Sequence, residues 1–352
     1  MHDLKTDARP ALTGMDRADL LRLCEAAEVK PSHAERLNAS VFRYGVTDVD
    51  AIPDLPAALR SYIKTNLRNI EPECLADQQD SDGTRKLLLK LPDGGEVETV
   101  LIPTAGRLTQ CISTQVGCAA GCTFCLTAKG GLVRNLSAAE MVAQLMYAQN
   151  TSGEKIRNIV LMGMGEPLHN YDEVAKFVRI AADPQGLAFS PKRITLSTSG
   201  LVPGIRRMIE EKLPCSLAVS LNATTDDVRE KIMPVNKKYP IAVLMDALRD
   251  YIAAFGKKRV LIEYVLLKGI NDSLEDAKRL VQLLDGIDAT VNLLPFNAHT
   301  GSEFESPDDE QVSLFRAELV KASLVAVVRE SRGRDISAAC GQLRSESRKK
   351  AI

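Results

Sequence analysis

The sequence has no tryptophan, few aromatic residues and only four histidines. None of these, His2, His33, His169 and His299, lies at a spacing from the cysteines that suits a shared zinc site. No uninterrupted apolar run is long enough to cross a membrane. Residues 1–14 are polar and of mixed charge, unlike a signal peptide. We therefore expect a soluble protein of the cytoplasm with no membrane partner.

The chain also lacks an excess of either charge, since 45 lysine and arginine residues are offset by 46 aspartate and glutamate residues. Proteins that coat nucleic acid are normally basic. Any nucleic-acid partner must therefore bind local basic segments, although each such segment is more often an ordinary solvated surface. The candidate segments are residues 192–193, 237–238, 257–259 and 348–350.

The length of 352 residues allows one large core and a small accessory unit. Residues 15–75 are predicted to be helical, because Asp16 can cap a first helix and apolar residues recur at helical spacing as far as Ile63. Residues 86–102 form strand-like runs around the glycine-containing turn 92–95, which predicts a hairpin. We therefore expect an N-terminal helical accessory domain at 1–80 and a β-hairpin extension at 81–110.

From Cys111 onward, strands and helices alternate. Ser137, with Glu140 three residues later, and Ser273 are placed to cap two of the helices. Successive β–α units predict an α/β fold whose parallel sheet curls into a partial barrel at 111–343, followed by a basic tail at 344–352. Ligands of such folds bind at the carboxyl ends of the strands. The strand-like runs are 159–162, 194–197, 217–221, 260–267, 291–296 and 324–328.

Four of the eight cysteines crowd into one short segment. Cys118, Cys122 and Cys125 are separated by three and then two residues, and Gly117 and Gly121 permit a tight backbone path. Three thiolates at this spacing can ligate a [4Fe–4S] cluster and leave one iron open. The open iron can bind the amino and carboxylate groups of S-adenosylmethionine (SAM). Because this spacing is typical of the radical SAM superfamily, we expect both cofactors.

A structural zinc site is the alternative interpretation of these cysteines, and it requires a fourth ligand nearby. Cys111 precedes the three by a gap that fits no common zinc motif. The segment Gly-Met-Gly-Glu-Pro at 163–167 favours SAM, because it directly follows the next predicted strand. Its glycines allow the backbone to approach a ligand, and Glu166 can accept the ammonium group of a methionine moiety.

The sequence resembles the RlmN family of RNA adenine methyltransferases, whose sister group is Cfr. The resemblance extends along nearly the whole chain, and Cys340 is its most discriminating residue because ordinary radical SAM enzymes lack such a cysteine. Pro167 and residues 295–297 look more like RlmN than like Cfr. The most specific segments are 97–100, 111–125, 163–168, 196–200, 234–239 and 335–343.

The resemblance implies a set of site residues. Glu98 would occupy the acid/base position of the family. Three positions depart from the family pattern, since Asn222 replaces a frequent histidine, Phe296 a common tryptophan and Ala128 a usual glycine. Asn222 can still form a hydrogen bond to a ribose hydroxyl. The implied SAM contacts are Gly165, Glu166, Ser197, Ser220, Leu221, Asn222 and Asn297.

The resemblance also implies the chemistry, which uses two SAM molecules per turnover. Cys340 takes a methyl group from the first, and a radical derived from the second removes hydrogen from that methyl group. The resulting carbon adds to carbon 2 of an adenine in 23S rRNA, or in tRNA beside the anticodon. Cys111 then attacks Cys340, so that a disulfide forms and the RNA is released.

The implied partners are these RNAs, gripped in part by the helical accessory domain, and an electron donor of flavodoxin or ferredoxin type; we expect a monomer. Two other functions stay open: methylation at carbon 8 of the rRNA adenine, as by Cfr, and non-catalytic RNA binding around a structural metal. Taken alone, Cys340 would be a buried packing residue and Glu98 a solvated strand carboxylate. Cys24, Cys74 and Cys215 are interpreted as packing residues.

Overall fold

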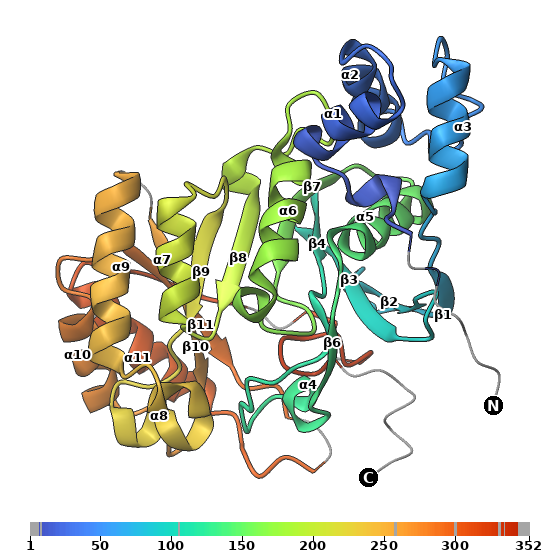
Figure 1. Ribbon diagram of the computed structural model, residues 1–352. Coiled ribbons are helices and arrows are strands. Elements are labelled where there is room, and N and C mark those ends of the chain that lie inside the picture. The colour runs from blue at the N-terminus through green and yellow to red at the C-terminus, as the bar shows by residue number, and fades with distance from the viewer. Residues whose placement is uncertain are drawn as a thin grey trace.

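The computed structural model describes residues 7, 9–104, 106–256, 259–298, 301–329, 332–333 and 335–343. Its centre is a ten-stranded sheet with helices on the outside (Figure 1). The predicted basic tail at 344–352 lies outside the described residues, as do Lys257 and Lys258. No helix of the described part combines the length and the apolar character that a membrane span needs.

A small group of helices begins the chain. Asp16 caps the first α-helix as expected, because its Oδ1 accepts from the Asp19 N–H at 2.9 Å while Asp19 accepts from the Asp16 N–H. A Cβ at Gly14 would lie 2.7 Å from the Cβ of Ala139, so this unit sits tightly on α5 (Ala138–Ser152). The elements are η1 (Leu12–Gly14), α1 (Arg17–Ala26), α2 (Ser32–Asn38), the π-helical η2 (Ala39–Arg43) and α3 (Ala57–Asn66).

An antiparallel region forms one side of the sheet. It consists of β1 (Glu73–Gln79), β2 (Arg85–Lys90), β3 (Glu96–Thr104) and β4 (Arg107–Cys111), in that spatial order. The predicted hairpin is therefore present as β2 and β3, but it belongs to a larger unit. No strand was predicted for β1, which is polar and largely exposed, or for β4, whose sequence Arg-Leu-Thr-Gln-Cys is mostly polar. The division at residue 80 stays a prediction, although β1 pairs with β2 inside the sheet.

A parallel region forms the other side, and β4 is its first strand. It continues through β7 (Ile156–Leu161), β8 (Ile194–Thr198), β9 (Ser216–Ser220), β10 (Val260–Leu266), β11 (Ala289–Pro295) and β12 (Val325–Val328). All six predicted strands are confirmed, with ends displaced by up to three residues. The end strands β1 and β12 do not pair with each other in the described residues. The predicted partial barrel is thus confirmed as an open one.

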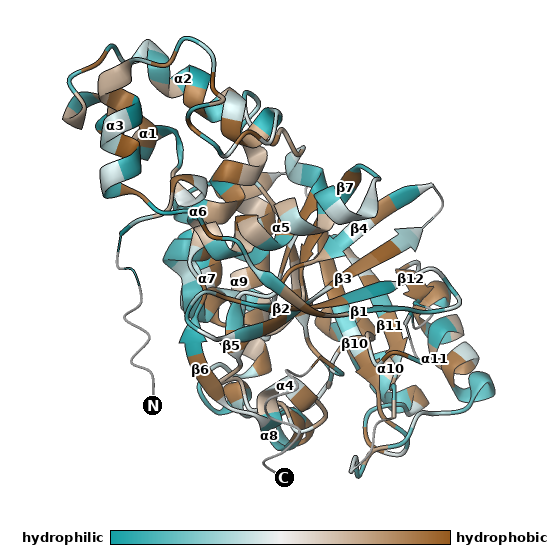
Figure 2. Cartoon of the chain, turned by 90° about the vertical axis from the view of Figure 1, so that its right-hand side faces the viewer, coloured by the Kyte–Doolittle hydropathy of each residue, from teal (hydrophilic) through white to brown (hydrophobic). Residues whose placement is uncertain are grey.

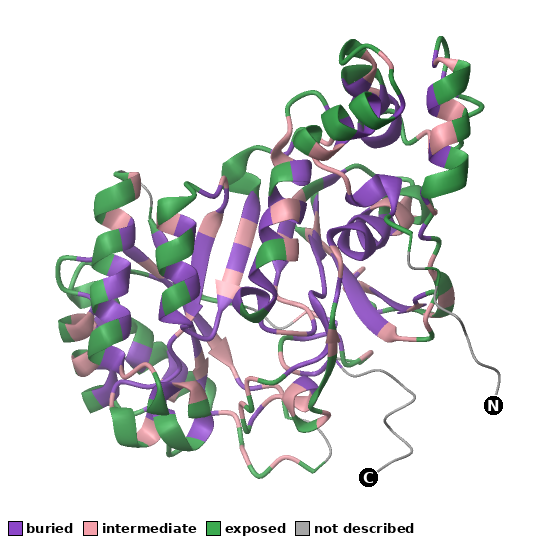
Figure 3. Cartoon of the chain, viewed as in Figure 1, coloured by how far each residue is buried: buried purple, intermediate pink, exposed green. Residues whose placement is uncertain are grey.

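Helices cover the outer face of the parallel region, and Figure 3 shows their exposed sides turned away from a buried sheet. Ser137 and Ser273 cap α5 and α10 as expected, each accepting from the backbone N–H three residues later. The helices are α6 (Tyr171–Ala182), α7 (Val202–Glu210), α8 (Asp226–Ile232), α9 (Ile241–Phe255), α10 (Leu274–Leu283) and α11 (Asp309–Lys321).

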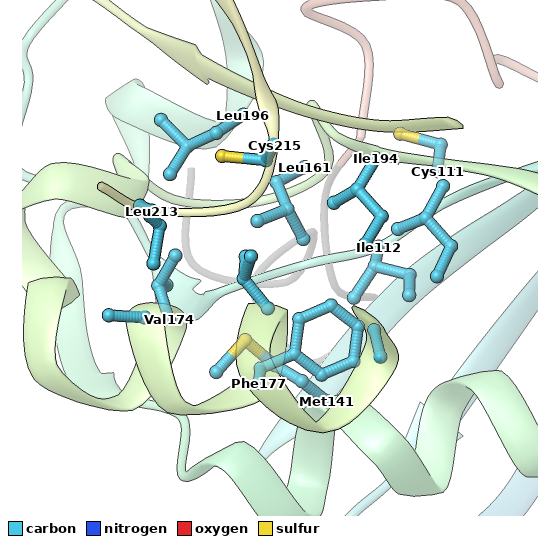
Figure 4. Packing of buried hydrophobic residues seen from close by; sticks show 14 of the residues in the cluster. Cys111, Ile112, Met141, Leu161, Val174, Phe177, Ile194, Leu196, Leu213 and Cys215 are labelled. Carbon is cyan, nitrogen blue, oxygen red and sulfur yellow. The ribbon is translucent and has the colours of Figure 1, made fainter. Parts of the chain in front are cut away.

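The hydrophobic core lies between these helices and the sheet, where Figure 2 shows apolar residues concentrated. Figure 4 shows Phe177 and Met141 packed beneath Leu161 and Ile194, all of which are buried. Cys215 joins this cluster, Cys24 is fully buried in the helical unit, and the half-buried Cys74 packs against the core. The interpretation of these three cysteines as packing residues is confirmed.

Truncation of Phe177 tests this core. Phe177→Ala should lower the free energy of unfolding by about 3–5 kcal/mol, because the lost ring leaves a cavity among rigid neighbours. Leu314→Ala is the control, since Leu314 is 46 % exposed on α11, and should change the same quantity by less than about 0.5 kcal/mol in urea denaturation. Equal effects of the two substitutions would contradict the packing described.

Candidate active site

A cavity opens at the carboxyl ends of the parallel strands, as the fold predicts. In Figure 1, α4 (Leu126–Lys129), α8 and the last described segment lie at this same end of the sheet. The cavity is lined by the cysteine segment, by the ends of β7 to β11 and by Cys340 with Gly341. Segments from the whole length of the parallel region therefore meet at one site.

Cys118, Cys122 and Cys125 all line this cavity. Their segment leaves β5 (Gln115–Gly117), which pairs with β6 (Leu132–Asn135), and the Cys118 N–H donates to the Gly131 carbonyl at 3.0 Å. Gly121 has a φ of +70°, the left-handed region that glycine adopts without strain. The expected tight backbone path is therefore present.

The chemistry of the three thiols fits the binding of a multi-iron cluster. Burial raises the pKa of Cys118 to about 12 and also raises that of Cys122. Thiolates at such positions need positive charge beside them, and bound iron supplies it. In the described part of the chain, no group of three His, Cys, Asp or Glu side chains is close enough to hold a single metal ion. A four-iron cube is larger than one ion and is bound by thiolates set further apart.

The loop after β7 brings Glu166 to the cavity. Gly165 has a φ of +109°, and a Cβ there would lie 2.7 Å from the Cβ of Gln115. Gln115 Oε1 accepts from the Glu166 N–H at 2.9 Å, while the Glu166 carboxylate accepts from the backbone N–H groups of Leu168 at 3.0 Å and Ser199 at 2.7 Å. Glu166 is thus a buried, oriented carboxylate with lone pairs left to bind an ammonium group.

The other expected cofactor contacts divide into two groups. Gly165, Ser197, Ser220, Asn222 and Asn297 line the cavity, whereas the Leu221 side chain is fully buried in the core. Asn222 has a φ of +56°, which asparagine tolerates better than most residues. Its Oδ1 accepts from the Val265 N–H at 2.8 Å, so it joins β9 to β10. The departure at this position therefore has a structural role of its own.

Cys340 lines the cavity and its side chain is exposed. Cys111, at the edge of the cluster in Figure 4, is buried, and burial together with nearby Cys340 raises its pKa. Glu98 is only 3 % exposed and pairs with Lys86 Nζ at 3.0 Å. Neither Cys340 as a packing residue nor Glu98 as a solvated carboxylate describes the structure, so both of these readings are wrong.

Comparison with known proteins agrees with this geometry. Residues 112–283 match the family model of the radical SAM superfamily. The dual-specificity RNA methyltransferase RlmN of Phenylobacterium zucineum is 46% identical over 97% of this chain and 92% of its own length. That of Syntrophotalea carbinolica is 50% identical over 86% of this chain and 80% of its own. The chain belongs to the RlmN family.

A solved structure agrees with RlmN membership. A radical SAM methyltransferase from Sphaerobacter thermophilus superposes with a TM-score of 0.89 at 43% identity, covering 96% of this chain and 100% of that one. The cofactors of an RlmN-family chain are a [4Fe–4S] cluster and SAM. Cys118, Cys122 and Cys125 would hold the cluster, which bound together with SAM supplies a methyl group and a radical. Glu166 would bind the SAM ammonium group.

Two buried charged residues of this RlmN-family site were not predicted from the sequence. Arg229 on α8 donates to the carbonyls of Ser199 at 2.6 Å, Ser220 at 3.2 Å and Leu221 at 2.9 Å, and burial lowers its pKa to about 10. It therefore holds the loops after β8 and β9 together. A charged residue in a short amphipathic helix gives no sign of this burial, so no sequence pattern identifies it.

Glu263 is the second missed residue. It lines the cavity, accepts from Asn292 Nδ2 at 2.8 Å, and burial raises its pKa. Its register places it beside Ser220 on β9. A single carboxylate inside the apolar strand β10 was a visible signal, because an unpaired charge is rarely placed in such a run.

Removal of one thiol tests the cluster site. After anaerobic reconstitution, Cys122→Ala should retain less than about a tenth of the iron and sulfide of the unaltered chain, because two thiolates do not hold a four-iron cluster. Cys24→Ala removes a buried thiol from the N-terminal helical unit and should bind iron normally. Full iron content in Cys122→Ala would contradict the assignment.

Proposed function

We propose that this chain methylates carbon 2 of adenine in 23S rRNA and in tRNA beside the anticodon. The observation that carries the proposal is the position of Cys340, which faces the cavity lined by the three cluster cysteines and lies near Cys111. The names of the relatives support RNA as the methylated molecule. Carbon 2 rather than carbon 8 rests on the resemblance of residues 295–297 to RlmN.

Cys340 is the proposed methyl carrier. Its sulfur forms a bond to the methyl carbon of SAM while the bond from that carbon to the SAM sulfur breaks, and the thiol proton is released. Its sulfur shares the cavity with the expected cofactor contacts Ser220 and Asn297. Carbon 2 of adenine is electron-poor, so it is attacked by a carbon radical and not by a cationic methyl donor.

Cys111 is the proposed resolving residue. Its thiolate attacks the sulfur of Cys340, so that an S–S bond forms while the S–C bond to the RNA breaks. The carbon that leaves Cys340 keeps the electron pair, gains a proton and becomes the new methyl group. Glu98, buried on β3 and paired with Lys86, is the proposed acid/base residue for the proton lost from carbon 2. The one electron lost from the adduct with this proton would pass to the cluster, so that a closed-shell adduct is left for Cys111 to attack.

The basic segments differ in their distance from this site. Lys237 ends η5 (Pro234–Lys237) and Lys238 follows it, while Pro234 lies near Gly121 of the cysteine segment. Lys192 and Arg193 instead precede β8, at the opposite end of the sheet. We therefore place the RNA backbone on Lys237 and Lys238, with the helical domain as a further contact. The proposed molecule is a cytoplasmic monomer reduced by a flavodoxin- or ferredoxin-type protein.

Nucleoside analysis tests the proposal directly. The reconstituted enzyme, SAM and a reductant are incubated separately with 23S rRNA and with tRNA that lack the modification. We expect 2-methyladenosine in both RNAs by mass spectrometry. The appearance of 8-methyladenosine alone would overturn the assignment in favour of Cfr-like activity. Methylation of neither RNA by an iron-loaded enzyme would reject the proposed substrates.

The two cysteines have distinguishable roles. Cys111→Ala should accumulate a covalent protein–RNA adduct, because release needs the second thiol, and should lower product release at least about 100-fold. Cys340→Ala should give neither adduct nor product. Denaturing gels with labelled RNA measure both, and Cys215→Ala, a buried core residue, is the control with normal turnover. Free RNA and free protein alone from Cys111→Ala would contradict the resolving role.

A further inference from the structure

The segment that carries Cys340 crosses the open side of the barrel. It leaves the end strand β12 and reaches the turn between β1 and β2, at the opposite edge of the sheet. The Gly333 N–H donates to Asp82 Oδ2 at 3.1 Å, and the Asp335 N–H donates to Asp80 Oδ2 at 3.1 Å. Backbone–carboxylate bonds therefore join the chain beyond β12 to the turn that follows β1.

The receiving turn is already ordered by its own bonds. Asp82 Oδ1 accepts from the Thr84 N–H at 2.8 Å, and Asp80 Oδ1 accepts from the Ser81 hydroxyl at 3.1 Å. The Asp80 N–H donates to the Thr84 carbonyl at 2.8 Å. Each carboxylate thus uses one oxygen to hold the turn and the other to hold the Cys340 segment. The turn therefore presents two acceptor oxygens to that segment in fixed positions.

Gly333 makes the fit between turn and segment close. Its φ is +65°, and a Cβ there would lie 2.6 Å from the Cβ of Ala338 and 2.9 Å from Cγ2 of Thr84. The Ala338 N–H donates to the Gly333 carbonyl at 2.8 Å, which closes a short loop just before Cys340. Any side chain at Gly333 would push the segment off the turn.

Two further contacts fix the segment on either side of Cys340. Before it, Lys86 Nζ donates to the Ser337 carbonyl at 3.4 Å while it pairs with Glu98. After it, the Leu126 N–H donates to the Gly341 carbonyl at 2.8 Å, and the Thr127 hydroxyl donates to the Leu343 carbonyl at 2.6 Å. The backbone on the two sides of Cys340 is therefore bound to β2 and to α4 of the cysteine segment.

We propose that Asp80, Asp82 and Lys86 form a clamp that holds the Cys340 segment so that Cys340 stays within reach of Cys111. They are positioning residues, and the inference rests on the proposed disulfide step. Lys86 on β2 and Cys111 on β4 both pair with Val100 on β3. The side chains of Lys86 and Cys111 therefore lie on the same face of the sheet. A tethered thiol reacts at an effective concentration that falls when its segment is free to move.

The equilibrium between the two thiols and glutathione measures this effective concentration without RNA or turnover. The iron-loaded chain, with Cys24, Cys74 and Cys215 changed to alanine, is equilibrated anaerobically with mixtures of reduced and oxidised glutathione. Mass spectrometry of alkylated peptides then gives the fraction of Cys111–Cys340 disulfide. Iron content and unfolding temperature are recorded for every variant, so that loss of cluster or fold is recognised.

We expect the double variant Asp80→Ala/Asp82→Ala to lower the equilibrium constant for disulfide formation at least about tenfold, which corresponds to roughly 30 mV. Gly333→Ala, which disturbs the same contact from the other side, should act in the same direction, as should Lys86→Met. Asp77→Ala is the matched control, because Asp77 is a carboxylate of β1 that pairs with Arg85 and has no described bond to residues 332–343. It should change the constant by less than about twofold.

The negative results of this experiment distinguish a failure of the clamp from a failure of the proposed function. If the parent chain forms the disulfide and the clamp variants form it equally well with iron bound, the clamp is refuted while the proposed function stands. If the parent chain forms no Cys111–Cys340 disulfide at any glutathione ratio, the two sulfurs do not meet, and both the resolving step and the clamp are refuted. If the Asp80/Asp82 variant does not fold, the equilibrium constant of Gly333→Ala is compared with that of the parent chain instead, and an unchanged constant refutes the clamp.

Discussion

The open sheet is the constraint on which the rest of the molecule depends. Because β1 and β12 do not pair, one side of the barrel must be covered by something other than a strand. The C-terminal segment covers it and brings Cys340 to the cavity. β4 belongs to both regions of the sheet, antiparallel to β3 and parallel to β7, and its last residue is Cys111. The junction of the two regions therefore places Cys111, and the bonds between the C-terminal segment and the β1–β2 turn place Cys340.

Buried charge is held mainly by backbone groups at this site. Glu166 accepts from two backbone N–H groups, and Arg229 donates to three backbone carbonyls. Such partners belong to fixed loops, so each charge also fixes the loops that it joins. Side-chain partners also contribute, because Lys86 pairs with Glu98, and Glu263 accepts from Asn292 Nδ2. The cavity thus keeps charged groups oriented without using up all their hydrogen-bonding capacity.

Much of the parallel region was predictable from the sequence, because its strands are apolar runs and two of its helices, α5 and α10, carry serine caps. The cysteine spacing and Glu166 were also predictable, since each needs only local sequence to be recognised. β1 and β4 were not, because both are short of apolar residues and so lack a clear period. The bonds of Asp80 and Asp82 were not, because their partners lie about 250 residues away. Arg229 was not, because nothing in its helix indicates that its charge is buried. Leu221 was implied as a contact, yet its side chain belongs to the core.

The bond between Asp80 and Asp335 has a consequence for how the molecule is made. These residues are separated by 255 positions, so the contact forms only after nearly the whole polypeptide has been synthesised. The parallel strands and the cysteine segment emerge from the ribosome earlier and are free to fold first. The thiol proposed to carry the methyl group thus belongs to the part of the chain that is synthesised last, and its segment docks on strands made before it.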